Sequence, residues 1–287
     1  MSGRAGVPVR VRRVSSELRE LRLRSGLGAE EVARALGISM SKLSRMESGQ
    51  RGLQPDDVAA LLGLYRVPAQ RRNELLGIVR NAHKPNWWPA QESRTPLLEE
   101  LTAFERTATA FRNYEPSIVP GLLQTSEYTV ALCEASAREF SSAEVDRMVT
   151  SRLERQQILR TRPDQDFEFL IEQAVLERPT GGIGVMYRQL RHLSSAISRE
   201  NVEIRVMPSS VGTHSGMDGP LLLLQFPDHQ DLVYLENRAA TSYLEEPQYV
   251  TEAKDVLAQL RCLALPTTES AALIASLAER LAREPKE

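Results

Sequence analysis

Signals that begin and end helices follow one another closely between residues 15 and 80, and they constrain the fold of this 287-residue chain more than any other feature. Ser15 or Ser16 can cap a first helix, which Gly26 can end. The later signals are the turn residues Gly37 and Gly49, the cap Ser39, and the helix-initiating prolines Pro55 and Pro68. We therefore predict five short helices joined by tight turns, which form a compact helical domain over residues 14–83.

Beyond residue 97 the sequence alternates between helical and strand-like segments. Strands are predicted over 166–172, 202–207, 221–226 and 232–236, the last two as a hairpin. Helices are predicted over 97–113, 125–138, 141–161, 183–199, 246–264 and 268–283. The predicted fold class is α+β, with an N-terminal five-helix bundle followed by a mixed α/β C-terminal domain over residues 97–287.

Two segments lie outside these predicted domains. Residues 1–13 contain four arginines among glycine, proline and valine, and they are predicted to form a flexible basic arm. Residues 84–96 contain three prolines and are predicted to be a linker. Because tryptophan is wasteful in a free linker, Trp87 and Trp88 are expected to anchor one domain to the other.

The charge of the chain divides between its two parts. Residues 1–80 hold 15 basic and 8 acidic side chains, a charge of +7, whereas residues 81–287 hold 21 basic and 30 acidic side chains, a charge of −9. This asymmetry predicts an N-terminal part that binds a polyanion. No apolar run is long enough to span a membrane, and the N-terminus lacks the apolar core of a signal peptide. With isolated cysteines at 133 and 262, we expect a cytoplasmic protein without membrane contact.

The segment 28–49 carries the clearest functional pattern. Ala33 allows two helices to cross closely, and Gly37 supplies the tight turn between them. Three apolar residues are expected to hold the following helix against the core, namely Ile38, Leu43 and Met46. The residues expected to face outward are Met40, Ser41, Lys42, Ser44 and Arg45.

These outward side chains suit the major groove of double-stranded DNA. Ser41 and Arg45 are four residues apart and share a helix face, so both can reach base edges in one pose. Arg45 can bind guanine O6 and N7 with two hydrogen bonds, while Lys42 can meet a phosphate or a base. Gln50 and Arg51, with Arg24 and Gly26 nearby, are expected to contact phosphates.

Residues 14–66 resemble the XRE-type helix-turn-helix of phage-repressor-like transcription factors. The resemblance rests on V-A-x-x-L-G-I-S from Val32 to Ser39 and on S-x-x-E-S-G from Ser44 to Gly49. It implies a structural ion pair between Arg22 of the first helix and Glu47 of the recognition helix. The family's second helix often begins with a phosphate-binding Gln or Ser, whereas this chain has Ala29.

The C-terminal part resembles the C-terminal domain of antitoxin-like regulators from actinobacteria. The segments that carry this resemblance are 114–128, 151–159 and 202–216. The resemblance implies a regulator encoded beside a small partner protein, with a role in development or secondary metabolism. We predict a sequence-specific DNA-binding regulator that acts as a homodimer and is a repressor. The alternative is an antitoxin-like interaction module that sequesters a small protein encoded in the neighbouring gene.

Nothing in the sequence favours an enzyme, a metal site or a cofactor. The four histidines are not spaced as ligands with another His or Cys, and His214 with Ser215 lacks the pattern of a nucleophile elbow. TGGIG at 180–184 lacks phosphate-loop spacing and is predicted to be a turn. Two segments keep two interpretations each. Residues 141–161 are expected to form either a solvated or dimer face or a second nucleic-acid surface. Residues 114–124 are expected to form either a packed loop or a ligand pocket.

Overall fold

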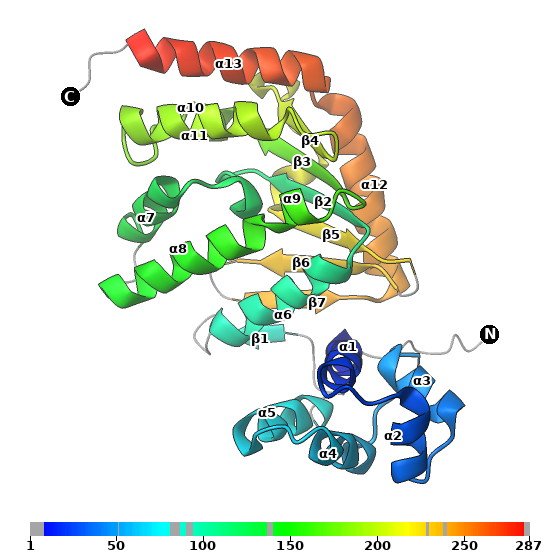
Figure 1. Cartoon of the computed structure of the whole chain (residues 1–287). Coiled ribbons are helices and arrows are strands. Elements are labelled where there is room, and N and C mark those ends of the chain that lie inside the picture. Colours follow the sequence, from blue (N-terminus) through cyan, green and yellow to red (C-terminus); the bar gives the residue numbers. More distant parts are fainter. Residues whose placement is uncertain are drawn as a thin grey trace. The chain divides into compact units, whose positions relative to one another are not determined.

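A computed structural model describes residues 9–50, 52–80, 87–89, 94–136, 140–227, 230–237 and 240–283. The chain divides into two compact units, Met1–Trp87 and Trp88–Glu287, and each is described by itself (Figure 1). The division falls within the segment 84–96 that the sequence indicates as a linker. Among the described residues, no helix is long and apolar enough to cross a membrane.

The described residues of the N-terminal unit form five helices, as the helix signals predict. They are α1 (Val9–Arg24), α2 (Ala29–Ala35), α3 (Met40–Glu47), α4 (Pro55–Leu64) and α5 (Ala69–Arg80). The turn between α2 and α3 needs Gly37 because its backbone is left-handed, with φ of 63°. Ser39 then begins α3 as its N-cap, and its side chain accepts a hydrogen bond from the Lys42 backbone N–H at 3.1 Å.

One apolar core joins these helices. Val32 and Ala33 of α2 are buried against it, and so are Leu43 and Met46 of α3, each with 1% of its surface exposed. Ile38 packs against the same core while remaining partly exposed. The interior therefore fixes which side of α3 faces solvent.

The flexible arm predicted for residues 1–13 is wrong for its last five residues. Helix α1 begins at Val9, and Val11 and Arg12 are buried. Val11, Val14 and Leu18 recur at helical spacing, so they form an apolar stripe that continues α1 toward the N-terminus. Residues 1–8 lie outside the described residues.

The C-terminal unit is built on a seven-stranded mixed sheet. Its spatial order is β1-β7-β6-β5-β2-β3-β4, in which β2, β3 and β4 are parallel neighbours and β2-β5-β6-β7 pair antiparallel. The strands are β1 (Trp87–Pro89), β2 (Ala110–Glu115), β3 (Asp166–Glu172), β4 (Val202–Met207), β5 (Leu221–Gln225), β6 (Leu232–Glu236) and β7 (Ala240–Leu244). This unit confirms the predicted α+β class and the β5–β6 hairpin.

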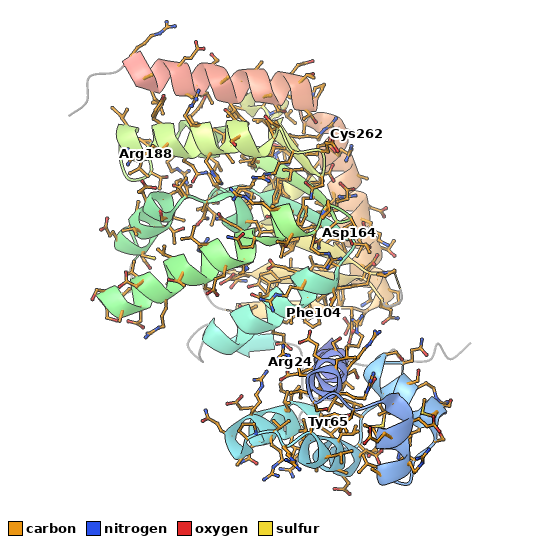
Figure 2. The ribbon with its side chains drawn as sticks, in the orientation of Figure 1. Arg24, Tyr65, Phe104, Asp164, Arg188 and Cys262 are labelled. Atoms are coloured by element: carbon orange, nitrogen blue, oxygen red, sulfur yellow. The ribbon has the colours of Figure 1, made fainter. Side chains whose placement is uncertain are left out.

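Helices cover both faces of the sheet (Figure 1). On one face α12 (Pro247–Leu263) buries Leu257 and Leu260 against Leu170 and Leu223. On the other face α6 (Arg94–Thr107) places Phe104 against Tyr243, with ring centroids 5.7 Å apart (Figure 2). The remaining helices are α7 (Ser126–Glu134), α8 (Ser142–Gln156), α9 (Ile158–Thr161), α10 (Gln173–Glu177), α11 (Ile183–Ala196) and α13 (Thr267–Arg283).

The sequence prediction is wrong at the end of the helix placed over 97–113. Helix α6 ends at Thr107, and residues 110–115 form β2 in the middle of the sheet. The polar residues Arg112 and Asn113 prevented the prediction of this strand, because a buried strand is expected to be apolar. In the structure the Asn113 side-chain amide is buried and donates to the Leu221 carbonyl at 3.2 Å.

The short strands β1 and β7 were also not predicted. β1 (Trp87–Pro89) lies within the segment predicted as a linker, where it forms the edge of the sheet beside β7. The rest of that segment is described only from residue 94, where α6 begins. The expectation that the Trp87 and Trp88 side chains anchor one domain to the other lies outside what the structure describes.

Candidate nucleic-acid interface

Helix α3 presents four exposed side chains on one side. Successive residues of a helix are about 100° apart, so Met40, Ser44, Ser41 and Arg45 fall within an arc of about 140°. All four are exposed, whereas Met46, Leu43 and Glu47, at about 240°, 300° and 340° from Met40, are buried. The exposed arc contains one thioether, two hydroxyls and one guanidinium, and it contains no carboxylate.

A buried ion pair fixes α3 against α1. Arg22 Nε and Nη2 donate to the two Glu47 carboxylate oxygens at 2.8 and 2.9 Å, and the two side chains are only 12% and 7% exposed. The hydrogen bond to Glu47 raises the pKa of Arg22 above its ordinary value, so the guanidinium stays charged. These are the two residues that the family resemblance predicts to pair, and their planar bidentate geometry restrains the orientation of α3.

Lys42 departs from its expected outward orientation. Its side chain is 26% exposed, and its ammonium nitrogen lies 2.7 Å from Oδ1 of Asp57 in the first turn of α4. At about 200° from Met40 around the helix, Lys42 lies at the border between the exposed arc and the buried side. The Asp57 carboxylate therefore balances the charge of the Lys42 ammonium group, which the sequence analysis expected to contact DNA. Asp57 is a functional candidate that the sequence reasoning used only as a helix-start signal.

The remaining predicted contact residues surround the exposed arc. Arg45 is exposed, and its Nε donates to the Ser41 carbonyl at 3.1 Å within the same helix. Gln50 is exposed just after α3, and Arg51 lies outside the described residues. Arg24 is exposed and pairs with Glu20 at 3.1 Å. Ala29 packs against the core, and its methyl side chain has no polar atom that could bind a phosphate.

Two of the four arginines in the charged segment 141–161 turn toward the protein interior. Arg155 forms an ion pair with Glu105 of α6 at 2.6 Å, with side chains 10% and 1% exposed. Arg152 donates to the side-chain oxygen of Gln124. A surface that directs its cations inward is poorly suited to phosphate contacts, so the solvated or dimer face is the favoured interpretation.

Of the two interpretations of residues 114–124, a packed loop or a ligand pocket, the structure favours the packed loop. Val119, Leu122 and Leu123 are buried. The Gln124 side chain donates to the Val119 carbonyl at 2.6 Å, and the Gln189 side chain of α11 donates to the Leu123 carbonyl at 2.7 Å. These amides satisfy the carbonyls of the loop from inside, which favours the packed-loop interpretation.

His214 and Ser215 do not form a nucleophile–base pair in the structure. Nε2 of His214 lies 3.2 Å from Glu172, and its Nδ1 accepts the backbone N–H of Gly216 at 3.2 Å. Both ring nitrogens are therefore occupied, and Ser215 Oγ has no hydrogen-bond partner among the residues that the structure describes. The described residues contain no group of three or more His, Cys, Asp or Glu side chains that could hold a metal ion.

The glycine-rich segment 180–184 forms a turn over residues 180–182 and then the start of α11. Gly181 and Gly182 have left-handed backbones, with φ of 70° and 86°. A Cβ at Gly181 would lie 2.7 Å from the Ala131 side chain, so the turn also packs closely against α7. This close packing explains the glycine without a bound phosphate.

Comparison with known protein families gives two matches. Residues 13–75 match a helix-turn-helix domain, which includes the whole of α2, α3 and α4. Residues 98–276 match a domain of unknown function, DUF5753. No curated protein and no solved structure matches the chain. The helix-turn-helix match supports a DNA-binding regulator in general, and the matched residues include α3.

Proposed function

Because the chain belongs to the DUF5753 family and carries an N-terminal helix-turn-helix domain, we propose that it is a sequence-specific transcriptional regulator of the XRE type. The observation that carries this proposal is the exposed arc of α3, which offers Ser41, Ser44 and Arg45 on one side. Arg45 binds a guanine edge, and Ser41 contacts a base or phosphate beside it. The absence of carboxylates on the arc leaves nothing there to repel DNA.

The proposed regulator acts as a homodimer and represses transcription. A single helix-turn-helix module forms a small interface with DNA, and two modules on symmetric half-sites add both affinity and specificity. The C-terminal unit is the proposed dimerisation part, since its charge of −9 over residues 81–287 disfavours contact with DNA. We assign it no catalytic role, in keeping with the paired nitrogens of His214.

Selection from a random duplex library, followed by titration of the enriched site, tests the proposal. Arg45→Ala should weaken binding by about 1–3 kcal/mol and relax the preference for one base pair. Arg188→Ala is the matched control, because Arg188 is an exposed arginine of α11 (Figure 2). Failure to enrich any sequence, or equal binding by Arg45→Ala and wild type, contradicts the proposal.

The alternative is an antitoxin-like module that sequesters a small partner encoded in the neighbouring gene, within the actinobacterial group that the sequence resembles. The acidic C-terminal part favours a basic partner. Co-purification of the chain with the neighbouring gene product tests this alternative. A stable complex supports it, and no complex at micromolar concentration contradicts it.

A further inference from the structure

Met40 is an apolar side chain on an otherwise polar surface of α3. It is 47% exposed, whereas the other two large apolar residues of this helix, Leu43 and Met46, are each 1% exposed. Met40 is the first residue of α3, and it begins the arc that ends at Arg45. The surface that faces the proposed DNA therefore has an apolar end and a cationic end.

The two ends require different base edges. In the major groove, thymine alone presents a methyl group, while the other edges present hydrogen-bond donors and acceptors. A thioether donates no hydrogen bond and accepts only weakly, so Met40 gains little from the polar edges. It gains free energy by removing an apolar methyl group from water, and a flexible, polarizable side chain adapts well to that contact.

We propose that Met40 contacts the C5 methyl group of a thymine and thereby makes the protein specific for a thymine-containing base pair. This inference rests on the proposed DNA-binding function and goes beyond it by naming the base. The Cα atoms of Met40 and Arg45 are five residues apart, a rise of about 7.5 Å along the helix. Since stacked base pairs are about 3.4 Å apart, Met40 and Arg45 contact different base pairs of one half-site.

The test replaces thymine by deoxyuridine, which removes the methyl group and leaves every hydrogen-bonding group in place. The enriched site is synthesised with each thymine replaced in turn, and each duplex is titrated with the full-length protein. We expect one replacement to weaken wild-type binding about fourfold, the effect of losing one buried methyl-sized group. The same replacement should leave the affinity of Met40→Ala unchanged.

Met217→Ala is the matched control, because Met217 is 67% exposed in the C-terminal unit. This variant should keep the fourfold effect. If no thymine replacement affects wild-type binding, or if Met40→Ala retains the full effect, the inference about Met40 is wrong while the proposed function stands. If no sequence is enriched at all, the proposed function itself fails. The deoxyuridine series on wild-type protein remains informative even if Met40→Ala folds poorly.

Discussion

The ion pair between Lys42 and Asp57 leads to a prediction opposite to the one that the sequence alone gives. If Lys42 faced DNA freely, Lys42→Ala would remove one phosphate contact. In the structure its ammonium group lies 2.7 Å from Asp57, and both side chains are only 26% exposed. The pair is therefore neutral as a unit. We expect Asp57→Asn to release the Lys42 charge toward DNA, and Lys42→Ala alone to change the salt dependence little.

The magnitude follows from counterion release. Each additional phosphate contact makes the slope of log K against log salt steeper by about 0.9. Raising the salt concentration from 50 to 200 mM should therefore reduce the DNA affinity of Asp57→Asn about 3.5-fold more than it reduces the affinity of wild type. In the double variant Lys42→Ala with Asp57→Asn, the slope should return to the wild-type value, because no free ammonium group remains.

Fluorescence anisotropy with a labelled duplex, titrated at several salt concentrations, measures the slope. Asp56→Asn is the matched control, since Asp56 is an exposed acid in the same first turn of α4. It removes the same charge from the helix N-terminus without releasing Lys42. A slope that falls by about 0.9 in Lys42→Ala and does not change in Asp57→Asn would refute the reasoning. Lys42 would then leave Asp57 and bind phosphate in the complex.

Three further predictions concern stability and are measured by chemical denaturation. Glu47→Ala should destabilise the N-terminal unit by about 3–5 kcal/mol because it leaves Arg22 buried without its partner; a loss below about 1 kcal/mol would show that the pair is dispensable. Gly216→Ala should destabilise the C-terminal unit by about 1–3 kcal/mol, since a Cβ would lie 2.6 Å from the Tyr114 ring; unchanged stability would mean that the loop moves away freely. Burial raises the pKa of Glu115 to about 7 from its ordinary 4.5, so the folded state holds the proton more tightly and stability should fall as pH rises through this window. Glu115→Gln should lose that part of the fall, and an identical pH profile in both proteins would contradict it.

The five helices of the N-terminal unit could be predicted because most of their limits depend on local chemistry. The start of α1 is the exception: the helix begins at Val9, so Ser15 and Ser16 lie inside it and do not cap it. Gly37 needs its left-handed backbone in any context, and Ser39 caps α3 through a hydrogen bond three residues away. The buried side of α3 also followed from the spacing of Leu43 and Met46. Exclusion from that core pattern leaves five residues expected to face outward, and all of them except Lys42 lie on the exposed arc.

Features that depend on partners distant in sequence could not be predicted from local patterns, and the pair between Arg22 and Glu47 was expected only from the family resemblance. β2 lies between β3 and β5, and the buried amide of Asn113 is acceptable there only because the Leu221 carbonyl accepts its hydrogen bond. Lys42 is paired because α4 places Asp57 beside it 15 residues later. In both cases the local sequence contains one half of the interaction, and only the fold supplies the other half.

The number of arginines in a helix is a poor guide to a DNA-binding surface, and α8 shows why. Its three arginines are balanced by three acidic residues in the sequence, and in the structure Arg155 lies against Glu105 and Arg152 against Gln124 inside the C-terminal unit. On α3 the opposite holds for Arg45, whose Nε donates to the Ser41 carbonyl of its own helix and whose side chain remains exposed. A cation contributes to polyanion binding when it can release counterions, which requires exposure and no protein carboxylate at its side. By this criterion Arg45 can act directly, and Lys42 acts only when Asp57 releases it.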